Sequence, residues 1–148
     1  MQQMFRDCTS LTSAPALPAM VLGSSCYSQM FSGCTSLSSA PELPATTLRY
    51  GCYSQMFSGC TSLSSAPELP ATTLTSNCYY NMFNGCTKLA YISADFTAWT
   101  PSNATTNWVT NVSSSGTFYC PTALGTNDTI TRGDNYCPTN WTVVNTDA

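Results

Sequence analysis

A 26-residue repeat constrains the fold of this chain more than any other feature. Residues 26–48 read CYSQMFSGCTSLSSAPELPATTL, and residues 52–74 repeat those letters without a change. Such self-similarity is typical of repeat proteins, in which each unit buries its apolar face only against its neighbours. We therefore expect stacked coils that share one hydrophobic core. Equivalent positions form columns along the chain: Met4, Met30, Met56 and Met82; Phe5, Phe31, Phe57 and Phe83; Cys8, Cys34, Cys60 and Cys86; Leu11, Leu37, Leu63 and Leu89; Cys26, Cys52 and Cys78.

The first half of each period has the apolar spacing of a short helix. The apolar residues lie at i, i+1, i+4, i+5 and i+8, which places them on one side of about two helical turns: Cys26, Tyr27, Met30, Phe31 and Cys34. Ser24 or Ser25 is expected to cap this helix, as is Asn77 in a later coil. The helix is expected to end at a left-handed glycine in each coil: Gly33, Gly59 and Gly85.

The second half of each period is predicted to be extended. Leu37, Ala40 and Leu43 recur at a spacing of three, and Pro41 and Pro44 exclude a continued helix. Stacked coils would align these segments as short parallel strands about 4.8 Å apart. The predicted fold class is an α/β solenoid, a leucine-rich-repeat-like right-handed coil of short parallel strands and short helices, with a small β-rich cap at its C-terminal end.

The repeat also predicts two regions. Residues 1–92 form a solenoid of about four 26-residue coils, and residues 93–148, which leave the repeat, form a C-terminal cap. Met1 aligns with Tyr27, so the first coil is truncated and we expect a longer array before it. The three tryptophans are expected to anchor the core of the cap: Trp99, Trp108 and Trp141.

Several segments resemble a known family. MFSGCTSL and MFNGCTKL resemble the F-x-x-C-x-x-L core of BspA-like leucine-rich repeats of bacterial surface proteins. NWVTNVSSSGTFYC and GDNYCPTNWTVVN resemble the capping segment that follows such repeats in related bacterial and phage-encoded proteins. The chain departs from the family where Pro41 and Glu42 interrupt the strand. The resemblance implies adhesion, or display on a cell or virion surface, and thus an extracellular location, but it names no ligand.

Charge excludes two classes of partner. Charged residues make up 7% of the chain, and four Lys and Arg residues leave a formal net charge of −3. Four cations are too few to form a basic stripe that could neutralise nucleic-acid phosphates or an anionic membrane surface, so we expect neither partner. The chain contains no run of about 20 apolar residues, so we expect no segment that inserts directly into a bilayer. The N-terminal MQQMFRDCTSLTSAP lacks the charge and hydropathy pattern of a secretory signal, so we expect no signal sequence within this chain.

The nine cysteines are interpreted mainly as buried thiols. Cys26 and Cys34 would lie about 12 Å apart along a helix, beyond the roughly 7 Å between Cα atoms that a disulfide allows. A disulfide between Cys120 and Cys137 in the cap is the second interpretation. The chain has no histidine and no C-x-x-C pair. We therefore predict no metal site and no cofactor.

Catalytic constellations are also weak. The lack of histidine removes every Ser-His and Cys-His pair. A Ser-Lys pair would need Lys88, the single lysine. Glu42 and Glu68 hold equivalent positions and resemble a carboxylate pair, but solvated charges at the edge of the coils are the simpler interpretation. The chain is predicted not to be an enzyme.

Repeated polar positions on the extended face indicate a ligand surface. The candidate residues form a flat, hydroxyl-rich and weakly acidic strip: Ser39, Pro41, Glu42, Ser65, Pro67 and Glu68. The predicted function is a binding or adhesion module on a bacterial cell surface that recognises a host protein or glycan. The alternative is a structural spacer or the receptor-binding part of a phage virion.

Two more columns of equivalent residues each allow a binding role. Tyr27, Tyr53 and Tyr79 are expected to pack against neighbouring coils, with stacking on sugars as the second interpretation. A column of threonines suggests, more weakly, binding to ice or to a crystalline polymer: Thr9, Thr35, Thr61 and Thr87. The oligomeric state cannot be predicted from the repeat.

Overall fold

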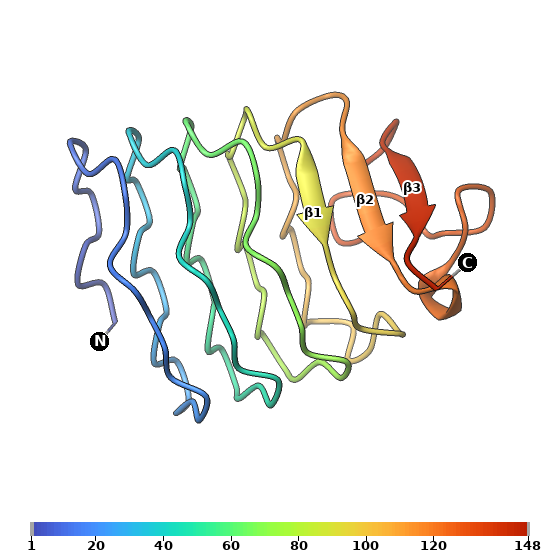
Figure 1. The fold of residues 1–148 in the computed structure, drawn as a ribbon, viewed down its shortest axis with the longest axis horizontal. Helices are drawn as coiled ribbons and strands as arrows, with labels where there is room; N and C mark the ends of the chain where they lie inside the picture. The colour runs from blue at the N-terminus through green and yellow to red at the C-terminus, as the bar shows by residue number, and fades with distance from the viewer. Residues whose placement is uncertain (1, 148) are drawn as a thin grey trace.

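Successive segments of the chain lie side by side as coils in the computed structural model, which describes residues 2–147 (Figure 1). Equivalent phenylalanine rings stack between neighbouring coils. The ring centroids of Phe31 and Phe57 are 5.7 Å apart, with planes within 8°. The Phe5–Phe31 and Phe57–Phe83 pairs are 5.6 and 5.8 Å apart. Residues 26 positions apart therefore share one continuous core, as the repeat predicts.

The predicted helices are absent from the described residues. The segment around 24–33 is a run of turns, and the single helical element is a short 3-10 helix, η1 (Thr122–Leu124). Alternate N–H groups in this run bond within the coil, as from Met30 to the carbonyl of Tyr27. The others bond to the next coil, as from Phe31 to the carbonyl of Met56 at 3.0 Å. A helix would need all these groups for itself.

Left-handed residues explain why the run is not helical. In one coil the backbone φ is 55° at Ser25, 56° at Gln29 and 76° at Gly33. A positive φ at every fourth residue breaks any right-handed helix. Gly33 is thus left-handed as expected, but Ser25 and Asn77 are left-handed as well and do not act as helix N-caps.

The predicted strands are absent from the exact repeats and occur after them. β1 (Tyr91–Ser93), β2 (Thr117–Cys120) and β3 (Thr142–Asn145) form a parallel sheet in the order β1-β2-β3. The extended parts of the repeats have only isolated bridges, such as Ser13 to Ser39. Prolines in the repeats lack the N–H group that a ladder needs.

The prediction of an α/β, leucine-rich-repeat-like solenoid is therefore wrong. No α-helix forms in residues 2–147, and the only sheet is the three-stranded one. Most of the chain consists of turns and irregular extended segments, held together by hydrogen bonds between coils and by the shared core.

Hydrogen bonding between coils continues beyond residue 92. Tyr91 pairs with Thr117, and Thr117 pairs with Thr142, at spacings close to the repeat. The N–H of Phe83 likewise donates to the carbonyl of Trp108 at 2.9 Å. Residues 93–147 thus add further coils to the same stack. Their role as a cap stays a prediction.

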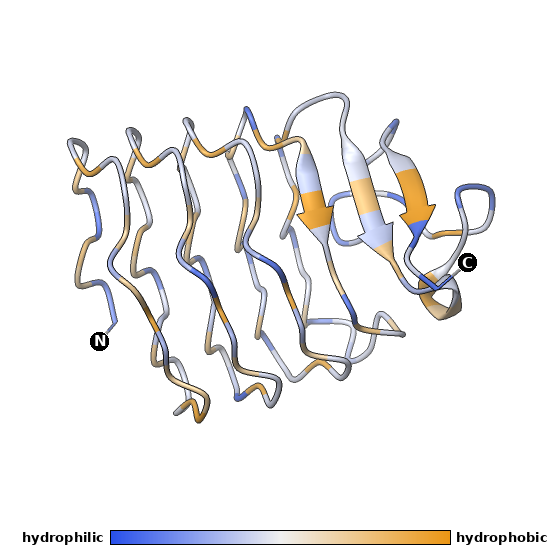
Figure 2. Ribbon diagram, in the orientation of Figure 1, coloured by the Kyte–Doolittle hydropathy of each residue, from blue (hydrophilic) through white to orange (hydrophobic). Residues whose placement is uncertain are grey.

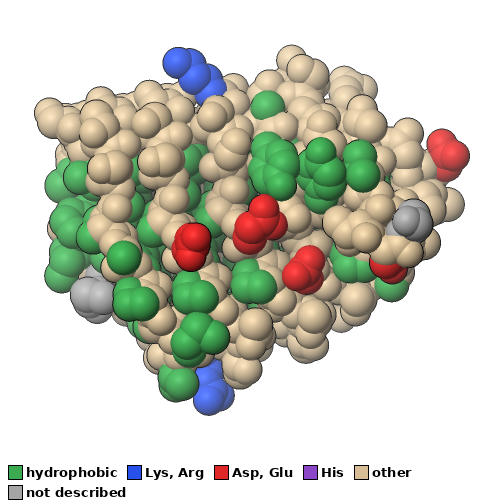
Figure 3. All heavy atoms as spheres, viewed as in Figure 1, with side chains coloured by type: hydrophobic (Ala, Val, Ile, Leu, Met, Phe, Trp, Pro, Cys, Tyr) green, Lys and Arg blue, Asp and Glu red, His purple; other side chains and the backbone are tan. Residues whose placement is uncertain are grey.

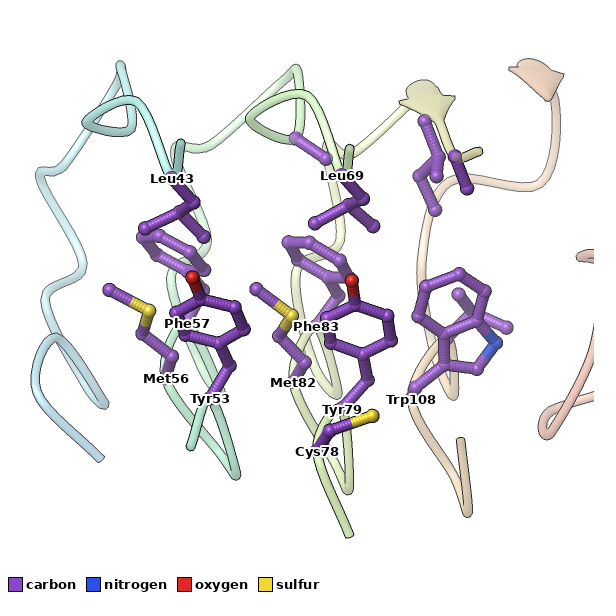
Figure 4. Packing of buried hydrophobic residues seen from close by; sticks show 14 of the residues in the cluster. Leu43, Tyr53, Met56, Phe57, Leu69, Cys78, Tyr79, Met82, Phe83 and Trp108 are labelled. Atoms are coloured by element: carbon purple, nitrogen blue, oxygen red, sulfur yellow. The ribbon is translucent and has the colours of Figure 1, made fainter. Parts of the chain in front are cut away.

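Apolar residues are spread along every coil and not gathered in one segment (Figure 2). Their side chains meet inside the stack, where Phe57, Phe83 and Trp108 are fully buried (Figure 4). Of the predicted cap anchors, Trp108 and Trp141 are buried, and Trp99 packs partly buried against the core.

Candidate functional site

A groove lies between the extended segments of the second and third coils. It encloses about 210 Å³ and is lined mostly by apolar side chains: Ala40, Pro41, Glu42, Leu43, Pro44, Pro67, Glu68 and Pro70. Four of the six predicted ligand-face residues belong to it, namely Pro41, Glu42, Pro67 and Glu68, but Pro41 and Pro67 are buried and not exposed as predicted. Ser39 and Ser65 are exposed but do not line the groove.

A second groove lies next to the first, between the first and second coils. It encloses about 340 Å³ and is lined by Ala16, Leu17, Pro18, Met20, Glu42 and Pro44. Glu42 and Pro44 line both grooves. The two hollows therefore adjoin along one ridge, and we refer to them together as the proline grooves.

Few N–H groups are available to join the two extended segments that border the first groove. In the described residues no backbone hydrogen bond joins segment 39–45 to segment 65–71. The next pair of coils is joined, because the N–H of Ala66 donates to the carbonyl of Tyr91 at 3.0 Å and that of Leu69 to Ser93 at 3.1 Å. Prolines lack a donor, so two facing segments that each contain two prolines have fewer N–H groups for a parallel ladder.

The edge of the grooves is acidic. Glu42 and Glu68 are exposed, and neither forms an ion pair with a cation in residues 2–147, where Arg6 and Asp7 form the one salt bridge, at 3.6 Å. Figure 3 shows acidic side chains set among apolar ones on the face that carries the sheet in Figure 1. A ligand with positive charge would meet no competing cation here.

Two tyrosines extend this face beyond the exact repeats. The hydroxyl of Tyr91 in β1 donates to Oε1 of Glu68 at 3.2 Å, and its ring lies 5.2 Å from that of Tyr119 in β2. Partial burial, followed by the nearby carboxylate of Glu68, raises the pKa of Tyr91. Neither tyrosine was predicted from the repeat, although Tyr91 follows Ser65 by one period.

The other predicted aromatic column is internal. Tyr27, Tyr53 and Tyr79 are buried, and neighbouring rings lie 6.1 to 6.2 Å apart with nearly parallel planes. Stacking between coils is confirmed for these rings, and their burial rules out stacking of the same rings on sugars. The threonine column containing Thr35 and Thr61 is exposed, and binding to ice stays a prediction.

The cysteines are free thiols that pack in or against the core. All nine are free, and Cys120 and Cys137, the pair considered for a disulfide, are separate buried thiols. The thiols of one column donate to carbonyls of the preceding coil at 3.0 to 3.1 Å: Cys34 to Phe5, Cys60 to Phe31, and Cys86 to Phe57. Each thiol thus pairs with a carbonyl in an otherwise apolar core.

Burial of these thiols predicts a loss of stability in alkali. It raises the pKa of Cys52 and Cys60 from 9.0 to about 12. An unfolded thiol ionises above pH 9, whereas the folded one keeps its proton until about pH 12. The stabilisation is therefore complete below pH 9 and declines as the pH rises to 12, by about 1.4 kcal/mol per pH unit for each thiol.

Urea unfolding followed by circular dichroism at several pH values measures this effect. We expect a constant midpoint from pH 7 to 8.5 and a steep fall between pH 9 and 11. A Cys60→Ala variant should show a shallower fall, because one ionising thiol is gone. A midpoint that stays constant up to pH 11 would contradict the burial of the thiols.

Other chemical groups gather into no site. No group of three or more His, Cys, Asp or Glu side chains in residues 2–147 is placed to hold a metal ion. Lys88, the lysine considered for a Ser-Lys pair, is exposed and forms no hydrogen bond within residues 2–147. The same part of the chain has no helix long and apolar enough to cross a membrane.

In the Arg-Gly-Asp segment 132–134, only the charge of the acidic side chain is available to a partner. Asp134 is exposed. The Arg132 guanidinium instead ties together the last loop, donating to the carbonyl oxygens of Asn127, Pro138 and Trp141 at 2.8 to 3.3 Å. A partner that needed both charges would first have to break these bonds.

A scan against protein-family models, a search of curated proteins and a search of solved structures all found no match for this chain.

Proposed function

We propose that this chain is a non-enzymatic binding or adhesion module that recognises a protein or glycan through the proline grooves. The observation that carries the proposal is that four of the six predicted ligand-face residues line one open apolar groove, whose acidic edge forms no ion pair in residues 2–147. Display on a bacterial cell surface is part of the proposal. It rests on the resemblance of the motif formed by Phe31, Cys34 and Leu37 to the repeat core of bacterial surface proteins.

The size and chemistry of the grooves favour binding over catalysis. Their volumes of about 210 and 340 Å³ lie at or below the lower end for pockets that enclose a small molecule. Glu42 and Glu68 stand exposed at the edge, whereas carboxylates that act as acid or base catalysts are tuned by enclosed surroundings. Open apolar hollows with charged edges instead suit side chains of a larger partner.

Reversal of the acidic edge tests the proposal. A Glu42→Lys, Glu68→Lys double variant should lose at least about tenfold of its affinity for a ligand of the wild-type chain, because both carboxylates face that ligand. The ligand is first identified on arrays of glycans and extracellular-matrix proteins probed with the wild-type chain. Affinities are then compared by surface plasmon resonance.

The matched control is an Asp128→Lys, Asp134→Lys double variant. It makes the same change in net charge at exposed residues outside the proline grooves, and it should bind as the wild type does. Equal loss in both variants would show a general effect of charge and overturn the proposed site. If the chain binds nothing on either array, but the cell or virion that carries it still attaches to its target, then the chain is instead the structural spacer.

A further inference from the structure

The walls of the first proline groove carry prolines in matching pairs. Pro41 and Pro44 lie three residues apart on one wall, and Pro67 and Pro70 lie three apart on the other. Pro41 and Pro67 are buried and Pro44 and Pro70 are half-buried, so pyrrolidine rings line both walls of the groove, together with buried Leu43.

These walls are poorly suited to strand addition. A peptide that joins a sheet edge pairs with a row of free N–H and C=O groups on that edge. The four prolines remove donors from both walls, and the two walls form no ladder with each other. The occupant therefore has to bind mainly by packing, as proline-rich segments do, because their polyproline II conformation is preformed and has no internal hydrogen bonds.

The charge of the first groove and the residues that line it favour a peptide over a glycan as the ligand. Of the eight residues that line the first groove, only Glu42 and Glu68 have polar side chains, whereas a sugar requires many hydrogen-bonding groups. Both carboxylates lack a cationic partner in the described chain. Beside Glu68, the ring of Tyr91 provides an aromatic face on which a guanidinium or ammonium group can lie.

We propose that the proline grooves bind a proline-rich segment of a partner protein in the polyproline II conformation, with arginine or lysine side chains that pair with Glu42 and Glu68. This inference rests on the proposed binding function and names its class of ligand. Pyrrolidine rings of the partner pack into the apolar hollows, and its basic side chains reach the acidic edge and Tyr91.

Three synthetic peptides with blocked ends separate conformation from charge. The probe is (Arg-Pro-Pro)₃, and the comparisons are (Arg-Gly-Gly)₃, which keeps the charge but is flexible, and (Glu-Pro-Pro)₃, which keeps the conformation but reverses the charge. Calorimetry should show the probe binding about tenfold more tightly than the flexible peptide, because less ordering is required and because glycine has no ring to pack into the hollows, and no binding of the acidic one. Affinity for the probe should fall as salt is added.

Variants and mapping locate the contact. Amide chemical-shift changes with the probe should centre on the non-proline residues of segments 16–20, 40–44 and 66–71. A Glu42→Gln, Glu68→Gln variant should bind the probe about tenfold more weakly, whereas an Asp128→Asn, Asp134→Asn variant, with the same change in net charge, should bind it as the wild type does.

Three outcomes would overturn the inference: no binding of (Arg-Pro-Pro)₃, equal affinity for the flexible peptide, or shifts centred on another face. A glycan or folded protein whose binding depends on Glu42 and Glu68, found while the probe fails, would keep the proposed function and reject this class of ligand. Failure of every ligand at this face would reject both.

Discussion

A Phe57→Ala variant is expected to lose about 3–5 kcal/mol of the free energy of unfolding. The Phe57 ring is fully buried and stacks on Phe31 and Phe83 at 5.7 and 5.8 Å. Its removal leaves a cavity between two coils that the hydrogen bonds of the turn runs hold in place, so the site cannot collapse to refill it. Domains are commonly stable by only about 5–15 kcal/mol, so this single change removes a large share.

Urea unfolding monitored by circular dichroism measures this loss, and Phe5→Ala is its matched control. Phe5 occupies the same column at the end of the described stack, where it is only partly buried and stacks on one ring, that of Phe31. Less apolar contact disappears there, so we expect less than about half the loss seen at Phe57. Equal losses at the two positions would mean that the column does not act as a stacked core.

The columns could be predicted from the sequence because the period alone determines which residues of neighbouring coils lie next to each other. The helix could not. Apolar residues at Cys26, Met30 and Cys34 have a spacing of four, and over eight residues a spacing of four is hardly distinguishable from the 3.6 of a helix. A second series of residues, also four apart, has a left-handed backbone and distinguishes the run from a helix; one of these residues, Gly33, was interpreted as the end of a helix.

Gln29, Gln55 and Asn81 belong to that second series. They share one column and have φ values of 51° to 56°. Glutamine is not a usual left-handed residue, but here the side chains form a ladder in which the amide of Gln3 donates to Gln29 at 2.9 Å and that of Gln29 donates to Gln55. Contacts between coils therefore outweigh the local preference of glutamine. A prediction based on local pattern alone does not include such contacts.

The candidate site was predicted in part for a similar reason. Periodicity placed Pro41 and Glu42 beside Pro67 and Glu68, and the first groove contains all four. The repeat could not show that a groove opens, because this depends on backbone hydrogen bonds that the two facing segments do not make. It also could not show that Tyr91 joins the face, since the letters change there although the backbone keeps the period.

A Gly116→Ala variant is expected to lose about 3 kcal/mol or more. A Cβ atom at Gly116 would lie 2.6 Å from the carbonyl oxygen of Ala90 and 2.7 Å from the Trp141 ring. Neither neighbour can easily move. The Ala90 carbonyl accepts the N–H of Thr117 at 3.0 Å, and the Gly116 carbonyl accepts that of Thr142 at 3.0 Å. The added methyl group would therefore force apart the first residues of the sheet.

Two other glycines calibrate this effect in the same urea titration, followed by tryptophan fluorescence. Gly23→Ala should be nearly neutral, because nothing lies within 4 Å of the new Cβ atom. Gly59→Ala should cost about 1–2 kcal/mol, since its φ of 75° is strained for alanine while its contacts are ordinary. Because Ala90, Gly116 and Trp141 belong to three successive coils, a large loss at Gly116 would show that residues after 92 are packed as tightly as the repeats. A loss at Gly116 no greater than that at Gly59 would instead indicate a loosely attached C-terminal region.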